Sequence, residues 1–382
     1  METVYFGIIL FLFLLAIFDL VVGVSNDAVN FLSSAVGAKV APYRVIMWIA
    51  ATGILCGALM SNGMMEIARH GIFRPEQFFF QELVCIFLAV MVTDVLVLDV
   101  FNTLGLPTST TVSMVFELLG GTFALTLVKM AGTEGMHFAD YLNTEKALSV
   151  IMGIFLSVAI AFFFGMVVQW LARLVFTFRY RERLKWTIGL FGGIASTAIV
   201  YFMLIKGVKD TTFMTSGAKA WIAAHGTLIA GCCLVGFTLL MQVLHWLRVN
   251  VFKVVVLLGT FALALAFAGN DLVNFIGVPL AGYDSYLDYA AHGAGSDTYL
   301  MSSLNEPART PFLFLAAAGV IMVWTLCTSK KAQKVIKTSV DLSRQDEGEE
   351  MFGSSAVARS IVRTSMSLAQ TLSNITPPRM RA

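Results

Sequence analysis

Two short polar segments share one pattern and lie 244 residues apart, from position 26 to position 270. In the first, Asn26 and Asp27 are followed by Asn30, and the second repeats this as Asn270, Asp271 and Asn274. Carboxylate and amide oxygens suit a hard cation such as Na⁺, while an amide N–H can serve an oxyanion. Because both segments follow apolar runs, where charged residues are costly, a duplicated site for a cation and an anion is the favoured interpretation.

A third segment, "LGLPTSTTVSMVFELLGG" (104–121), places four consecutive hydroxyl residues directly before an apolar helix. Pro107 disrupts helical hydrogen bonding, and the hydroxyls that follow it belong to Thr108, Ser109, Thr110 and Thr111. Ser and Thr are favoured N-caps, and a helix N-terminus attracts anions. Taken alone, the cluster fits a solvated loop as well as it fits an anion site.

Composition indicates which elements must position these residues. The chain has 382 residues, of which 58% are hydrophobic and 13% are charged, with a mean hydropathy of +0.80. Such a chain is typical of a polytopic α-helical membrane protein, because apolar runs long enough to cross a bilayer recur along it. The predicted spans are 4–22, 43–62, 79–100, 112–130, 148–172, 187–206, 218–241, 251–268 and 311–328, and the segment 101–130 either crosses fully or dips in and returns.

The basic segments 173–186, 245–253 and 329–337 are expected on the cytoplasmic side, which predicts an outside N-terminus if all nine segments span. Residues 1–22 lack a basic n-region and an A-x-A-like site, so they are interpreted as an uncleaved span. The glycines and serines around the duplicated motifs predict that both motif helices are interrupted near the midplane.

These three motifs resemble those of the PiT inorganic phosphate transporters, a family with GANDVANAFG-like and LPVSTTH-like motifs in two inverted repeats. The resemblance covers about residues 1–330. It implies an all-α integral membrane protein, an inverted-repeat secondary transporter with broken helices, a re-entrant hairpin and about 8–9 membrane segments. It also implies symport of inorganic phosphate with Na⁺ or H⁺, without a further cofactor. By position, the phosphate site would include Ser109, Thr110, Thr111, Asn30 and Asn274, and the cation site Asn26, Asp27, Asn270 and Asp271.

The repeat pattern also predicts how the chain is divided. Residues 1–175 would form the first repeat, 176–250 connecting membrane helices, 251–330 the start of the second repeat, and 331–382 a polar cytoplasmic loop or tail. A second L-P-x-S-T-T is expected after Pro311 and does not occur in this sequence. We therefore expect the chain to be truncated in its second repeat.

The sequence also departs from the family's pattern. Val112 stands where the family has a histidine, Phe31 and Phe275 stand where small residues are common, and three acids enter normally apolar segments: Asp94, Asp99 and Glu117. Asp99 fits either a proton-linked group or a bundle residue held by pairing.

Several functions remain open at this point. A sulfate or other tetrahedral oxyanion permease of the same fold is the runner-up to phosphate transport. A channel is less favoured, and an enzyme is not expected, since no catalytic or nucleotide-binding motif is present. The expected partners are phosphate, Na⁺ or H⁺ and lipid, with a homodimer left open, and the expected location is the bacterial inner membrane as a multi-pass protein.

Overall fold

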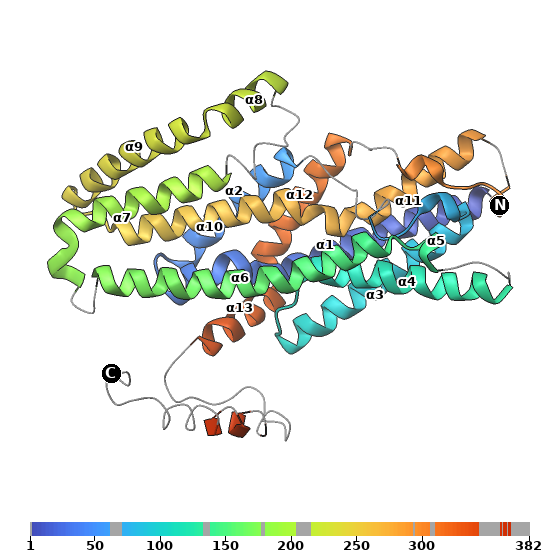
Figure 1. Cartoon of the computed structure of the whole chain (residues 1–382), viewed down its shortest axis with the longest axis horizontal. Helices are drawn as coiled ribbons and strands as arrows, with labels where there is room; N and C mark the ends of the chain where they lie inside the picture. Colours follow the sequence, from blue (N-terminus) through green and yellow to red (C-terminus); the bar gives the residue numbers. More distant parts are fainter. Residues whose placement is uncertain are drawn as a thin grey trace. The chain divides into compact units, whose positions relative to one another are not determined.

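The computed structural model describes residues 2–61, 71–132, 138–176, 180–203, 215–292, 295–305 and 310–343, together with 360, 362–364 and 366–367. It divides into two units, Met1–Val340 and Asp341–Ala382. The described residues are almost entirely helical, and their only β-type pairs are two isolated bridges, Phe73 with Leu142 and Phe79 with Leu300. The helices, shown in Figure 1, are α1 (Glu2–Gly37), α2 (Tyr43–Met60), α3 (Phe80–Leu104), α4 (Thr110–Gly132), α5 (Phe138–Tyr141), α6 (Thr144–Phe176), α7 (Tyr180–Phe202), α8 (Ser216–Ala224), α9 (Gly226–Trp246), α10 (Val251–Asn270), α11 (Leu272–His292), α12 (Phe312–Thr328) and α13 (Lys330–Leu342).

Seven helical segments of the described chain are long and apolar enough to cross a membrane. An eighth is added if α12 and α13, which meet at a bend of 65°, count as one span. The apolar part of α7, Thr187–Phe202, is shorter. These findings confirm the predicted all-helical membrane transporter fold. The helix after the hydroxyl cluster, α4, has 23 residues and is long enough to cross, whereas the re-entrant hairpin stays a prediction.

The core that positions the motifs is built on α1. The half of α1 from Leu20 onward packs with α2, α10, α12 and α13, while the half around Leu12 packs with α3, α4 and α11. Two glycines allow α2 to approach α10 closely: a Cβ at Gly53 would meet the Phe261 carbonyl oxygen, and one at Gly57 would meet that of Leu265. This G-x-x-x-G spacing is the small-residue pattern that brings membrane helices into backbone contact.

In contrast, α6 presents almost its whole surface outward, and Ala147 and Phe176 are its buried residues. Large apolar side chains are exposed along its length, including Phe155, Phe162 and Trp170. An apolar surface of this kind is stable against lipid tails, where it would be costly in water. This helix therefore contributes little to the packing that holds the polar motifs in place.

The beginning of the expected polar tail is an ordered helix. Helix α13 is amphipathic, and its Ala332, Val335 and Ile336 side chains are buried in the core that surrounds α1. Lys334 Nζ donates to the carbonyl oxygen of Thr103 near the end of α3. At that end, Gly105 adopts a φ of 76°, a left-handed conformation that glycine tolerates best, and it turns the chain toward α4.

Candidate functional site

The two duplicated motifs occupy different kinds of backbone. Asn26, Asp27 and Asn30 lie within α1, which runs without a break from Glu2 to Gly37, so the prediction of an interrupted first motif helix was wrong. Ser25 does not open the helix, because its hydroxyl donates to the Val21 carbonyl oxygen one turn back. Gly23 serves packing, since a Cβ there would overlap the Phe275 ring.

The second motif lies where α10 is followed by α11, two helices labelled in Figure 1. Helix α10 ends at Asn270, Asp271 is its C-cap, and α11 begins at Leu272. The interruption is short, since Asp271 N–H still donates to the Phe267 carbonyl oxygen at 2.7 Å. Asn270 is exposed and Asp271 is partly exposed, whereas Asn274 is buried. The second motif is therefore more accessible than the first.

The hydroxyl cluster brings the two motifs together at the N-terminus of α4. Thr110 donates its hydroxyl hydrogen to Asp27 Oδ2 at 2.9 Å. The next residue, Thr111, reaches toward Asp271 Oδ1 at 3.5 Å and accepts a hydrogen bond from Asn274 Nδ2 at 2.8 Å. Two consecutive threonines thus contact the carboxylates of motifs that lie 244 residues apart in sequence. The three predicted motifs therefore lie together in the fold.

Ser109 caps this helix. Its Oγ accepts a hydrogen bond from the backbone N–H of Val112 at 3.3 Å, and its side chain is exposed. The N-terminus of a helix carries partial positive charge and unpaired N–H groups, so it can bind an anion beside the two carboxylates. Asn30 is also exposed, and its Nδ2 lies 3.4 Å from Asp27 Oδ1.

Asn26 connects α1 to the turn that precedes α4. Its Nδ2 donates to Asn102 Oδ1 at 2.8 Å and to the Leu106 carbonyl oxygen at 3.1 Å, while its Oδ1 accepts from the Thr108 N–H at 2.7 Å. The Asn26 side chain is fully buried. Because both amide hydrogens and one oxygen lone pair are used, a cation at Asn26 would have only the second lone pair.

The charge of the site is negative. Asp27 is buried and Asp271 partly so, and no Lys, Arg or His in the described part of the chain forms an ion pair with either. A buried carboxylate without a cationic partner is costly, so this arrangement favours a bound cation or proton. Among the described residues, no group of three His, Cys, Asp or Glu side chains is placed to hold a metal ion by itself.

Comparison with known proteins identifies the family of this chain. A family model described as "Phosphate transporter family" matches residues 23–339, a range that includes all three motifs. The chain belongs to the phosphate transporter family. Among solved structures, the transporter is similar to one titled "The sodium-dependent phosphate transporter", with a TM-score of 0.63 and 19% identity over 88% of this chain and 78% of that chain. This likeness supports the fold of the transporter. No match was found among curated protein sequences.

Two residues that position this site were not predicted from the sequence. Asn102 is fully buried; besides accepting from Asn26, it donates to the Val22 carbonyl oxygen at 2.7 Å. Ser329, at the bend between α12 and α13, lies 2.7 Å from Ser25 Oγ. An asparagine within an apolar run was the available signal for Asn102, whereas Ser329 stands at a span end where polar residues are common.

The two phenylalanines that depart from the family pattern fill the core beside the site. Phe31 and Phe275 are both buried, and each packs near Phe267, with ring centroids 5.3 Å and 6.5 Å away. Asp99 is about half exposed, and its Oδ1 lies 2.5 Å from Lys331 Nζ. Its pairing with Lys331 agrees with the bundle role considered for Asp99.

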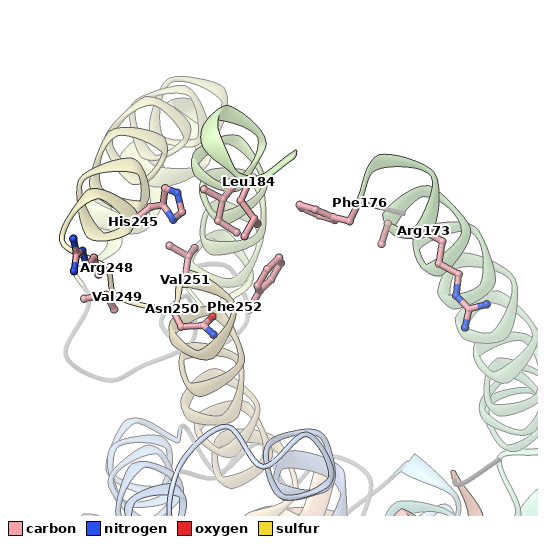
Figure 2. A pocket seen from close by; sticks show the side chains of 11 residues that line it. Arg173, Phe176, Leu184, His245, Arg248, Val249, Asn250, Val251 and Phe252 are labelled. Carbon is pink, nitrogen blue, oxygen red and sulfur yellow. The ribbon is translucent and has the colours of Figure 1, made fainter. Parts of the chain in front are cut away.

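A separate cavity of about 850 Å³ lies between the ends of α6, α7, α9 and α10. Its lining includes Phe176, Leu184 and Phe252, and Figure 2 shows Arg173 and Arg248 at opposite edges of it. None of the motif residues lines it. The residues around the α4 N-terminus, rather than this cavity, therefore form the candidate site.

Proposed function

We propose that this chain carries inorganic phosphate across the membrane together with a cation. The observation that carries the proposal is the pair of contacts at the start of α4, where Thr110 meets Asp27 and Thr111 meets Asp271. Membership of the phosphate transporter family supports phosphate as the substrate. The site thereby unites hydroxyl and N–H donors for an oxyanion with carboxylates for a cation.

Phosphate would bind at the N-terminus of α4. Ser109, Thr110 and Thr111 offer hydroxyls there, while Asn30 and Asn274 offer amide N–H groups from the two motifs. Asn30 and Ser109 are exposed, so their donors are free to turn toward a ligand. Thr110 donates to Asp27, and it would have to exchange this acceptor for a phosphate oxygen or bind phosphate through its backbone N–H.

The cation would neutralise the carboxylates of Asp27 and Asp271. Two unit charges 4 Å apart interact by about 4 kcal/mol at an effective dielectric constant of 20, so phosphate alone beside these carboxylates is repelled. A cation bound by Asp27 and Asp271 turns this repulsion into attraction. The exposed Asn270 and the buried Asn26 are the further proposed ligands of this cation. The coupling of the two solutes follows from the shared site.

Na⁺ and H⁺ are both candidates for the coupling ion. The similar solved structure is titled as sodium-dependent, which supports Na⁺. Sulfate has the same tetrahedral shape as phosphate, but the family assignment favours phosphate over it. We propose a multi-pass protein of the bacterial inner membrane, since outer-membrane spanning proteins are barrels. A homodimer stays a prediction.

The experiment is uptake of radiolabelled phosphate into proteoliposomes that contain the purified chain, with Na⁺ and pH gradients imposed separately. Uptake driven by one of the gradients, and reduced little by excess sulfate, is expected. Asp99→Asn is a matched control, because it removes one acidic charge outside the site. Failure of both gradients to drive uptake would overturn the proposal. Strong competition by sulfate would widen the proposed substrate from phosphate to tetrahedral oxyanions.

A further inference from the structure

A second group of acidic residues lies inside the bundle, apart from the motif site. Asp19 on α1 and Asp94 on α3 are almost completely buried, and Glu117 on α4 is partly buried. All three are in helices long and apolar enough to span the membrane. Burying acids in such segments costs free energy. Their presence on three neighbouring helices therefore indicates a function.

The carboxyl groups of Asp19 and Asp94 face each other within hydrogen-bonding reach. No protein donor in the described structure reaches either Asp19 oxygen or Asp94 Oδ1. Ser113 Oγ donates to Glu117 Oε1 at 2.7 Å and also lies within reach of Asp94, while Glu117 Oε2 has no donor. Four buried carboxyl oxygens of this cluster therefore have no hydrogen-bond donor among the described residues.

Among the described residues, the titratable groups that surround this cluster are acidic. The titratable groups that act on Asp19 are Asp94 from α3, Glu117 from α4 and Asp27 from α1 itself. The other helices that pack against α1, namely α2, α10, α11 and α12, contribute none to it. No basic side chain of the described residues pairs with the cluster. Two facing carboxylates in this setting cannot both remain ionised without a bound positive charge.

The geometry points to a proton-binding site formed by Asp19 and Asp94, with Glu117 and Ser113 beside them. One proton placed between Asp19 and Asp94 gives one carboxyl an O–H that donates to the other carboxylate, which satisfies an oxygen on each side. A proton needs only the two carboxyl groups, whereas Na⁺ would need several further oxygen ligands.

This site is connected to the motif site by two helices. Asp19 precedes Asp27 by eight residues on α1, about 12 Å along the axis, and Glu117 follows Thr110 by seven residues on α4, about 10 Å. Loading or release of the proton therefore changes the charge about two turns from both Asp27 and the α4 N-terminus. We infer that the proton is a second coupled cation; this part of the inference rests on the proposed transport of phosphate.

The test is infrared difference spectroscopy of the purified chain in lipid nanodiscs at neutral pH, in H₂O and in D₂O. The carbonyl band of a protonated carboxylic acid, shifted by D₂O, is expected in the wild type. It should be lost in Asp19→Asn and in Asp94→Asn, because the introduced amide donates to the remaining carboxylate. Asp99→Asn, which alters an exposed acid, should retain the band.

Three results would overturn the site: no such band in the wild type, a band that persists in both variants, or a band that disappears when Na⁺ is added at constant pH. The last result would assign the cluster to Na⁺. Gel-filtration profiles of the two variants show whether each remains folded, and either one that does is sufficient for the test.

A transport measurement separates this inference from the proposed function. Proteoliposomes with the wild type and with Asp94→Asn are compared for uptake driven by a pH gradient, and loss of the pH-driven component is expected in the variant. A band without any phosphate uptake would refute the proposed function alone. Unchanged pH-driven uptake in the variant would refute the coupling of this proton.

Discussion

The first motif, in α1, and the second, at the junction of α10 and α11, have the same polar residues in different structural settings. In the first, Asn26 is hydrogen-bonded to Asn102 on α3 and to the turn before α4, and Asp27 is buried and accepts a hydrogen bond from Thr110. In the second, Asn270 is exposed and Asp271 caps a helix that ends there. In the first copy, the asparagine holds the turn before α4 in place. In the second copy, the carboxylate is partly accessible. A duplicated motif therefore does not imply duplicated roles.

The largest expected effect is on transport, from Asp27→Asn. The variant keeps the shape of the site, and Thr110 can still donate to the amide oxygen, but a buried negative charge assigned to the cation is lost. We expect phosphate uptake to fall by about a hundredfold or more, the equivalent of about 2.7 kcal/mol. The measurement is initial uptake in proteoliposomes, and added Na⁺ or acid should restore little of it. Wild-type rates with unchanged ion dependence would give Asp27 a structural role.

Removing one asparagine from each motif tests whether the two copies have different roles. Asn26→Ala leaves the Thr108 N–H, Asn102 Oδ1 and the Leu106 carbonyl oxygen without their Asn26 partner, so we expect a loss of about 2 kcal/mol in the free energy of unfolding. Asn270→Ala removes an exposed side chain and should cost less than about 0.5 kcal/mol. Thermal unfolding in detergent measures both, and equal losses would contradict the division of roles.

The two threonines test the same difference through the apparent affinity for the cation. Thr110→Val removes the donor to the buried Asp27, and we expect the affinity to fall about tenfold, or about 1.4 kcal/mol. In Thr111→Val the lost contact to Asp271 is long, and water can replace it at this partly exposed carboxylate, so the change should be a few-fold. Uptake measured against cation concentration decides between them; a larger effect at Thr111 would reverse the assignment.

The smallest effect is expected outside both motifs. Asp99→Asn removes the ion pair with Lys331, in which both side chains are about half exposed. Exposed pairs of this kind contribute between zero and about 1 kcal/mol, so thermal unfolding should change little. A marked loss of uptake without loss of stability would instead show that Asp99 has the proton-linked role.

The membrane class, the positions of the polar motifs and the resemblance to phosphate transporters could all be predicted from the sequence. Hydropathy and local motif patterns encode these features, because they depend on residues near one another along the chain. The sequence placed α2, α3, α4, α10 and α12 close to their observed bounds. It could not show that α1 continues through its motif, because glycine disfavours a helix by about 1 kcal/mol per residue and tertiary packing overrides this preference.

Tertiary structure alone decided which partner each polar group has. Asn26 finds Asn102 76 residues away and Thr108 82 residues away, and Thr111 finds Asn274 163 residues away. In the sequence, Asp19 and Asp94 are isolated acidic residues in two different spans. Only the folded structure brings them together as a pair. Such contacts depend on the rotation and depth of each helix against its neighbours. Those are set by side-chain packing over the whole bundle, such as Gly23 against Phe275, and no local stretch of sequence specifies them.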